Sequence, residues 1–380
     1  MKKSLFVALI AAFGFGLVGV ALAGTPAAVT NGEMKASLLV WPKIVVSYDS
    51  SGFVDQDTII TIFNDGSGPV VLHCYWMDEK QYSDDFEWEI TRFQTVWFKA
   101  SDGAGMEGAK AVQVTPFLSE PVNGNGYTPF HGKYGELKCF AVDDSDVPIT
   151  KNNFTGTATI FNFTEGTAIG YNAYGFKRSG DPGTAGVLTL NGTEYDRCPA
   201  YLLGTFMLDG TSFGVQQRRV TASPGNLTLV PCDQDLRQDR LPIYTKANFT
   251  VWDEDEVGAT GAYLCFKCWV DTTLEDPPVV SKGMRAVVGF KNFTEAVVGG
   301  TYATVKITPV SGGAAPCAWG VDSPARPFIG LLFGSTYVNG KYASYGSLLQ
   351  SPSSGWVGDA PTIKYDAAGG GGSTPESNVR

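Results

Sequence analysis

Alternation of apolar and polar residues with a period of two is the feature that most restricts the folds open to this chain. In the segment Asp85–Thr91, the large side chains of Phe86, Trp88 and Ile90 stand at every second position. This pattern predicts a half-buried β-strand whose apolar face covers a core. Apolar residues at 3.6-residue spacing are rare after the N-terminal segment, and only 198–208 suits a short helix as well as a strand. The chain is therefore expected to be all-β.

Turn signals divide the chain into short strand-like runs. The runs Thr58–Phe63 and Val70–Trp76 are rich in β-branched and aromatic residues, and the glycine-rich stretch 64–68 separates them. This arrangement predicts a hairpin. Dipeptides that tolerate the positive φ angles of a tight turn predict three more hairpins, at Asn191-Gly192, Asp209-Gly210 and Asn339-Gly340.

A weak internal repeat indicates two related domains, although chance matching of common strand residues is the alternative. Three pairs of segments match in the same order, at offsets of 189, 189 and 193 residues: Leu38–Pro42 with Leu227–Pro231, Thr61–Asp65 with Thr250–Glu254, and Trp76–Asp78 with Trp269–Asp271. The repeat predicts two tandem antiparallel β-sandwich domains that meet near Ala222–Gly225. The expected organisation is a signal peptide at 1–23, a linker at 24–34, sandwich domains at 35–220 and 221–366, and a disordered tail at 367–380.

The N-terminus has the pattern of a cleavable secretory signal. Lys2 and Lys3 precede the apolar stretch Leu5–Val20, and the small residues Ala21–Ala23 form a cleavage site. Gly24 stands where a lipoprotein would carry cysteine, so lipid anchoring at this end is not expected. The mature chain is predicted to be exported to the cell surface or the extracellular space, with the periplasm as the alternative.

The acidic composition excludes some partners. The chain has a formal net charge of −10, and removal of the signal takes away two lysines. An acidic surface repels phosphate backbones, so nucleic acid is excluded as a partner. No stretch after the signal approaches the roughly 20 apolar residues of a membrane-spanning helix, so no transmembrane segment is expected in the mature chain. Other proteins or surface glycans are the expected partners, and self-assembly also fits.

Seven cysteines in an exported chain predict disulfide bonds and leave at least one thiol unpaired within the chain. Cys74 and Cys139 are the only cysteines of the first half, so they are predicted to pair. Trp88 lies between them, which is the order found in immunoglobulin domains, although Leu137 replaces the tyrosine expected there.

The second half contains a C-x-x-C motif formed by Cys265 and Cys268. This spacing occurs in redox, zinc and haem sites, but Trp269 stands where haem attachment needs histidine. No second close pair of cysteines completes a zinc site, and a strand-like context disfavours a thioredoxin-type site. Structural disulfides to the remaining cysteines are expected instead, with Cys198, Cys232 and Cys317 as the partners.

The sequence predicts no catalytic or cofactor-binding residues. The match to G-x-S-x-G at 210–214 lacks a histidine after Ser212, since His73 and His131 both precede it. Two acidic runs offer oxygen ligands to calcium, although neither follows the EF-hand pattern, and solvated loop acids are the alternative. The weak calcium candidates are Asp143, Asp144, Asp146, Asp253 and Asp255.

Short motifs carry a diffuse resemblance to known proteins. The opening Ala36–Pro42 and the strand ends Cys74–Asp78 and Cys268–Asp271 resemble uncharacterised exported bacterial proteins with tandem immunoglobulin-like β-sandwich domains. The resemblance covers most of the mature chain. It implies a location and an architecture, and it carries over no functional residues.

Three functional hypotheses follow. The preferred one is a non-enzymatic cell-surface or extracellular protein with a structural, adhesive or assembly role, because the domains repeat and no catalytic cluster is evident. The second is a carbohydrate-binding or carbohydrate-active secreted protein, with Trp97 or Trp356 as a stacking platform. The third is an outer-membrane β-barrel, which the cysteines, the prolines and the tail at Asn378–Arg380 disfavour.

Overall fold

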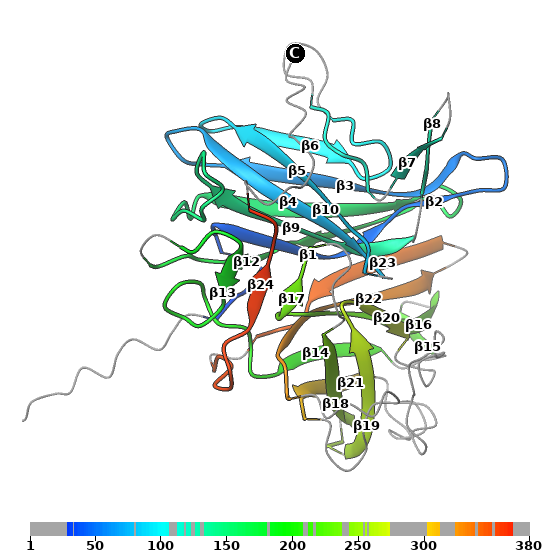
Figure 1. The fold of residues 1–380 in the computed structure, drawn as a ribbon. Coiled ribbons are helices and arrows are strands. Elements are labelled where there is room, and N and C mark those ends of the chain that lie inside the picture. Colours follow the sequence, from blue (N-terminus) through cyan, green and yellow to red (C-terminus); the bar gives the residue numbers. More distant parts are fainter. Residues whose placement is uncertain are drawn as a thin grey trace, which may run out of the picture.

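The computed structural model describes residues 29–367 with internal gaps (Figure 1). The gaps are 33, 80, 106–111, 118, 123–125, 130–132, 181–182, 208–211, 216–217, 238–242, 254, 257, 274–301, 312–323, 339–340 and 352–353. The expected signal peptide, part of the linker, nearly all of the expected tail and Cys317 lie outside the described residues. Every regular element within them is a β-strand, which confirms the all-β class, and none of them forms a helix able to span a membrane.

Two facing sheets, called here the first sandwich, form the upper part of Figure 1. One sheet has the order β12-β1-β9-β4-β5, with bounds Tyr174–Phe176, Leu38–Val45, Tyr134–Val142, Val70–Asp78 and Ser83–Ile90. The facing sheet has the order β11-β10-β3-β2, and β6 also pairs with β3. Its bounds are Thr167–Asn172, Phe154–Asn162, Val54–Asn64, Ser47–Tyr48 and Thr95–Lys99, and a separate pair is formed by β7 (Ser119–Val122) and β8 (Gly126–Pro129).

Side chains from both sheets fill the space between them. Trp76 on β4 meets Phe98 on β6 edge to face, with ring centroids 6.2 Å apart. Trp41 on β1 reaches the backbone of Gly156 on β10, where a Cβ atom would stand only 2.2 Å from the indole. Only glycine therefore permits this approach of the two sheets.

The alternation predicted for β5 is confirmed. Phe86 and Ile90 are buried in the core between the sheets, and Trp88 packs against that core. Glu87 and Glu89 point to the opposite face and are exposed. Because β5 is the edge strand of its sheet, this outer face stays open to solvent.

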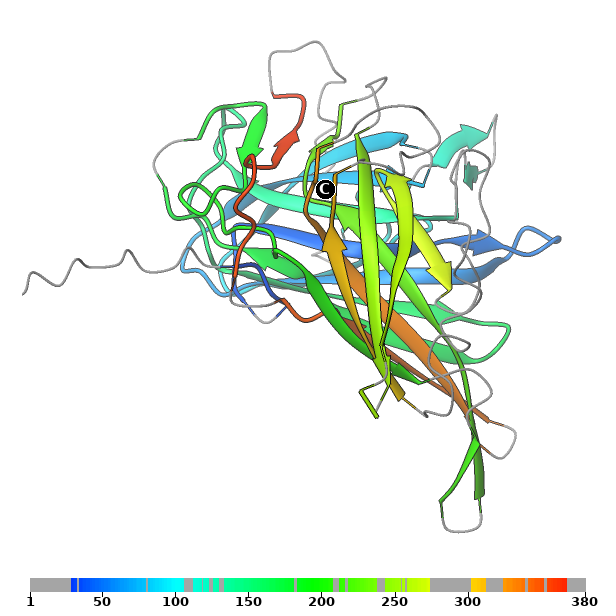
Figure 2. The same ribbon diagram turned by 90° about the horizontal axis from the view of Figure 1, so that it is seen from below.

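Residues 202–348 contribute a second pair of facing sheets, the second sandwich (Figure 2). One sheet has the order β14-β21-β18-β19, with bounds Leu202–Met207, Tyr302–Pro309, Tyr244–Asp253 and Gly258–Lys267. The other has the order β15-β16-β22-β23, with β20 also paired to β16. Its bounds are Ser212–Val215, Arg218–Pro231, Phe328–Val338, Lys341–Leu348 and Val270–Thr273.

A small third sheet and shared cores join the two sandwiches. Its order is β13-β24-β17, with bounds Val187–Thr189, Thr362–Lys364 and Gln234–Asp235. Leu188 and Ile363 of this sheet pack on the outer face of β1, β4 and β9 in a buried cluster that also contains Ile329 of β22. Further along β22, Leu331 packs in the core of the first sandwich, and Leu332 packs in the core of the second sandwich. The sandwiches are therefore not independent units.

The chain enters the second sandwich earlier than the expected boundary between residues 220 and 221. β14 and β15 precede that boundary, yet they pair with β21 and β16 of the second sandwich. The boundary itself falls inside β16. The predicted meeting point Ala222–Gly225 lies in the same strand, where the pairing register shifts between Ser223 and Asn226. Pro224 and Gly225 form a bulge at this point, because proline has no N–H group to donate to the neighbouring strand.

The repeated segments lie in equivalent sheets of the two sandwiches. The first pair lies in β1 and β16, and the second lies in β3 and β18 of the facing sheets. The third pair lies in β4 and at the start of β20, which share sheets with β1 and β16. The neighbours differ, because β9 separates β1 from β4 whereas β20 pairs directly with β16. The match therefore extends to sheet assignment and not to strand order.

Among the predicted hairpins, only the one at Asn339-Gly340 is confirmed, since β22 and β23 pair up to Val338 and Lys341 on either side of it. The hairpin expected between β3 and β4 is wrong, because these strands belong to facing sheets. The Asn64 amide donates to the carbonyls of Gly68 and Thr91, at 3.2 and 3.0 Å, and holds a turn that crosses the sandwich. Two further hairpins are wrong, because β14 and β15 lie in different sheets and β13 pairs with β24.

The first disulfide joins Cys74 to Cys139, the pair expected from the sequence. The two residues are register partners on β4 and β9, so the bond links neighbouring strands of one sheet. In an immunoglobulin domain the corresponding disulfide joins the two facing sheets. The position of this disulfide therefore argues against the immunoglobulin-like assignment.

The disulfide expected for each cysteine of the C-x-x-C motif is present at Cys265 and absent at Cys268. Cys198 and Cys232 pair with each other, and Cys268 is a free, buried thiol, whereas Cys265 is disulfide-bonded. The chain reverses after β19 at Cys268, which has a φ of 51°. This turn brings its sulfur into contact with the Gln81 amide of the first sandwich.

Candidate functional site

A cleft of about 470 Å³ opens where the two sandwiches meet. Its volume falls within the range of roughly 300 to 1,000 Å³ typical of ligand pockets. Strands of both sandwiches contribute to it. Its apolar lining comes from Val45, Ile160 and Ile169 and from the rings of Tyr134 and Phe333. Its polar and charged lining comes from the side chains of Gln56, Asn162, Glu165, Thr167, Ser344, Lys43, Asn226 and Asp271.

A proline in β1 places Lys43 in this cleft. The β1–β9 ladder shifts register between Trp41 and Ile44, as expected at Pro42, which cannot donate a hydrogen bond. The hydroxyl of Tyr171 fixes the bulge, since it accepts from the backbone N–H of Lys43 at 3.2 Å and donates to the Lys43 carbonyl. The bulge directs the Lys43 side chain toward the second sandwich.

Polar groups of the second sandwich bind the Lys43 ammonium. Nζ donates to both carboxylate oxygens of Asp271, at 2.8 Å each, and to the Asn226 side-chain oxygen at 2.7 Å. The hydroxyl of Thr228 donates to Asp271 at 2.6 Å. The side chains of Lys43 and Asp271 are only 9% and 15% exposed. A largely buried ion pair therefore crosses the junction of the sandwiches.

Aromatic rings flank this ion pair. The ammonium of Lys43 lies 5.1 Å from the centroid of Phe333 and 5.9 Å from that of Tyr134, within cation–π range. Tyr134 stacks on Trp269 with centroids 6.1 Å apart, and the Trp269 indole donates to the Pro42 carbonyl at 2.7 Å. Burial, and next the charge of Asp271, raises the pKa of Tyr134. Its hydroxyl is therefore neutral and able to donate at neutral pH.

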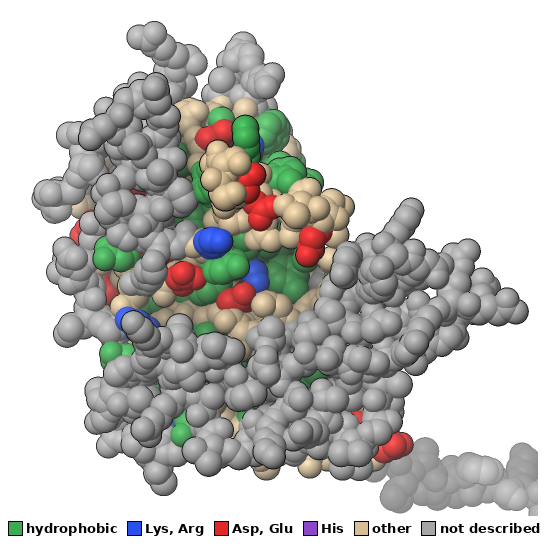
Figure 3. All heavy atoms as spheres, turned by 90° about the vertical axis from the view of Figure 1, so that its right-hand side faces the viewer, with side chains coloured by type: hydrophobic (Ala, Val, Ile, Leu, Met, Phe, Trp, Pro, Cys, Tyr) green, Lys and Arg blue, Asp and Glu red, His purple; other side chains and the backbone are tan. Residues whose placement is uncertain are grey.

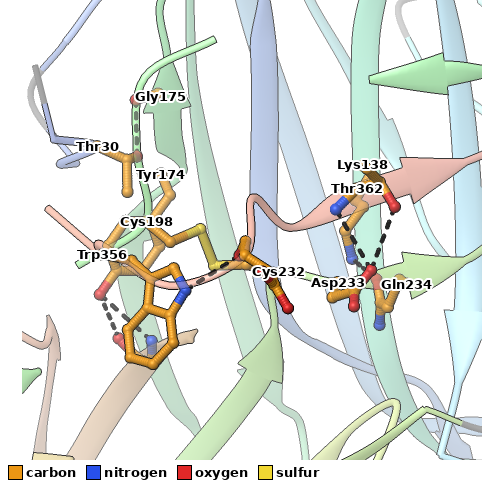
Figure 4. The surroundings of a disulfide bond; sticks show 12 residues. Thr30, Lys138, Tyr174, Gly175, Cys198, Cys232, Asp233, Gln234, Trp356 and Thr362 are labelled. Carbon is orange, nitrogen blue, oxygen red and sulfur yellow. Dashed lines mark hydrogen bonds between the residues drawn. A yellow bond between two sulfur atoms is a disulfide. The ribbon is translucent and has the colours of Figure 1, made fainter. Parts of the chain in front are cut away.

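A second buried polar cluster also joins the two halves (Figure 4). Glu136 and Lys138 form a buried ion pair on β9, and Gln234 of β17 bonds to both and donates to the Cys268 carbonyl at 2.8 Å. Burial raises the pKa of Glu136 and lowers that of Lys138. Figure 4 shows Lys138 and Gln234 of this cluster in the surroundings of the Cys198–Cys232 disulfide, so covalent and polar contacts together hold the end of β16 in place.

The calcium candidates after β9 do not converge on one point. The carboxylate of Asp143 accepts from two backbone N–H groups of its own turn, at 2.9 and 3.0 Å, and Asp144 is exposed. Asp146 turns the other way, and its carboxylate lies 2.8 Å from Nδ1 of His73. The three side chains therefore offer no common calcium site.

The other candidates from the sequence lie away from the cleft. Asp253 accepts a hydrogen bond from the backbone N–H of Asp255 at 3.0 Å, which closes another turn. Trp97 lies on β6 and is 37% exposed, and Trp356 follows the second sandwich, so neither tryptophan lines the cleft. Ser212 is in β15, paired with Thr221, and a strand does not suit a nucleophile elbow.

Sequence reasoning missed the residues of the cleft. Lys43 is an isolated lysine in an apolar strand, and the signal that could have found it is the preceding Pro42. Asp271 ends a repeated segment, and the repeat carries no signal for a charged partner. Tyr134 and Phe333 have no local signal, because only the packing of the sandwiches brings them together.

No known protein family matches the chain, and no curated protein matches it either. The chemistry of the cleft therefore rests on its own groups. On the side of the molecule seen in Figure 3, basic, acidic and hydrophobic side chains lie close together in the described part. The cleft lining combines rings with amide and hydroxyl groups, a set that binds polar ligands by stacking and hydrogen bonding.

Proposed function

We propose that this chain is an exported, non-enzymatic protein of the cell surface or the extracellular space, and that its tandem β-sandwiches form an adhesive module that binds a glycan. The observation that carries the proposal is the cleft between the sandwiches, where two rings and several uncharged polar groups surround a fixed ion pair. The secretory pattern of the N-terminus supports export, as do the disulfides, which persist in oxidising compartments.

A neutral ligand suits the cleft better than an anionic one, because the carboxylate residue Glu165 also lines it. The charge of Lys43 is already met by Asp271 and Asn226. Gln56 and Asn162 are register partners on β3 and β10, so two amide side chains stand next to each other at the rim. Neighbouring amides can bond adjacent hydroxyl groups, while an aromatic face stacks on the apolar face of a sugar ring.

Binding is tested with the full mature chain on a panel of immobilised glycans, followed by titration of each positive glycan against tryptophan fluorescence. The expected reporter is Trp269, because it stacks on Tyr134 of the cleft. Gln56→Ala and Asn162→Ala are each expected to weaken binding by about tenfold, the loss of one hydrogen bond or slightly more.

Trp97→Ala is the matched control, because this exposed residue lies on the first sandwich outside the cleft. The variant is expected to bind as the wild type does. Loss of binding in Trp97→Ala with unchanged binding in the two amide variants would place the glycan on the outer sheet face and refute the cleft. A panel without any bound glycan would contradict the glycan proposal and leave self-assembly or protein binding as the adhesive role.

A further inference from the structure

His73 lies at the centre of a group of carboxylates on the outer face of β4. It is only 3% exposed. Its Nδ1 atom lies 2.8 Å from Asp146 and 3.6 Å from Glu87, and its Nε2 atom lies 3.2 Å from Asp85. Both nitrogen atoms of one imidazole therefore face acidic oxygens.

Three elements bring these groups together. His73 and Glu87 are register partners on β4 and β5, and Asp85 lies two residues earlier on the same face of β5. Asp146 comes from the turn after β9 and has a φ of 57°, a left-handed conformation that costs free energy in a residue other than glycine. The Tyr365 hydroxyl donates to the Asp146 carbonyl at 2.8 Å and holds this turn over β4.

The cluster carries more negative than positive charge. Even the charged imidazolium supplies only one positive charge against three carboxylates. A divalent cation bound to neutral imidazole would balance the carboxylates better.

We propose that His73 Nδ1, Glu87 and Asp146 bind a divalent transition metal ion such as Zn²⁺, and that Asp85 orients the imidazole through Nε2. The three donor atoms lie within 4.8 Å of one another, and theirs is the one group in the described ranges with this arrangement. Zinc binds nitrogen and oxygen at about 2.0 to 2.2 Å, which puts neighbouring donors roughly 3 to 3.5 Å apart. The distances from His73 Nδ1 to the carboxylates of Asp146 and Glu87, 2.8 and 3.6 Å, lie on either side of that interval.

Two further features suit a metal ion of this class. Histidine combined with carboxylates favours zinc and its neighbours, whereas calcium prefers oxygen ligands alone. A carboxylate on the second nitrogen of a metal-bound histidine is the usual outer partner, and Asp85 occupies that place. The Glu87 and Asp85 side chains are 32% and 42% exposed, so an ion can enter from solvent and Glu87 can adjust its position.

The ion has a structural role in this position. It would tie β4 and β5 to the turn that contains Asp146, and through Tyr365 to the segment that follows β24. The site is separate from the cleft, so it stands or falls independently of glycan binding.

The test is calorimetric titration of the full mature chain, free of any affinity tag, with Zn²⁺ after treatment with a chelator. Glu87→Gln removes a ligand at an exposed position and is expected to weaken binding by at least about 100-fold, and Asp85→Asn by about 10- to 100-fold. Glu89→Gln is the matched control, because Glu89 lies on the same face of β5, two residues further along. It is expected to leave the affinity unchanged.

Absorption spectra with Co²⁺ in place of Zn²⁺ provide a second readout. His73→Gln is expected to change the visible bands of bound Co²⁺, because it replaces the nitrogen ligand. Equal Zn²⁺ affinity in the wild type and Glu87→Gln would overturn the proposal, as would the lack of any binding up to about 1 mM Zn²⁺. Circular dichroism of each variant shows whether its fold is intact.

Discussion

The ion pair between Lys43 and Asp271 is predicted to contribute strongly to stability because it crosses the junction of the sandwiches. Two charges about 4 Å apart attract each other by about 4 kcal/mol at an effective dielectric constant of 20. Removal of one partner of a buried pair costs about 3 to 5 kcal/mol. Because this pair borders a cleft and Asp271 keeps its bond from Thr228, we expect Lys43→Met to cost about 3 kcal/mol.

A double-mutant cycle of Lys43→Met and Asp271→Asn measures the pair directly. Urea unfolding of the four proteins, followed by fluorescence, is expected to give a coupling free energy of about 2 to 4 kcal/mol. The control cycle uses Lys99→Met and Asp102→Asn, an ion pair whose side chains are 38% and 47% exposed. Such a pair contributes less than about 1 kcal/mol. Coupling at the junction no larger than in this control would refute the reasoning.

Three further predictions concern the cysteines and one acidic residue. Replacement of Cys74 and Cys139 by alanine opens a loop with a sequence separation of 65 and should lower the free energy of unfolding by about 4 kcal/mol, as measured in urea. Burial raises the pKa of the Cys268 thiol to about 12, so a thiol reagent at pH 8 should label it only in denaturant; rapid labelling of the native protein would contradict its burial. Burial, and next the charge of Asp85, raises the pKa of Asp84 from 3.8 to about 6. This residue therefore favours the folded state below about pH 4 and loses that contribution as the pH rises toward 6. Relative to the wild type, Asp84→Asn should gain stability between pH 4 and 7, and a constant difference across that range would be the contrary result.

The class of the fold followed from local pattern, whereas the connections between strands did not. The alternation of Phe86, Trp88 and Ile90 predicted a strand with one buried face, because side-chain direction in a strand depends only on neighbouring residues. Whether a glycine-rich turn returns the chain to the same sheet or carries it to the facing one depends on distant partners. The β3–β4 turn after Asn64 carries the chain across, and its local sequence resembles that of a hairpin loop.

The same distinction separates the site residues that could be predicted from those that could not. Asp146 was a candidate cation ligand on the strength of its acidic neighbours, yet the structure sets it beside His73, which is 73 residues away. Lys43 and Asp271 are 228 residues apart. Contacts over such separations are set by the packing of the two sandwiches, and one sequence carries no local signal for them.

The third sheet also has a consequence for the biogenesis of the protein. β24, close to the C-terminus, lies between β13 and β17, which belong to much earlier parts of the chain. β13 and β17 do not pair with each other and are joined only through β24, so this sheet can close only after Thr362–Lys364 has been synthesised. A chain that stops before Thr362 would lack the strand that completes the sheet. The third sheet therefore closes only after all the described strands of both sandwiches have been synthesised.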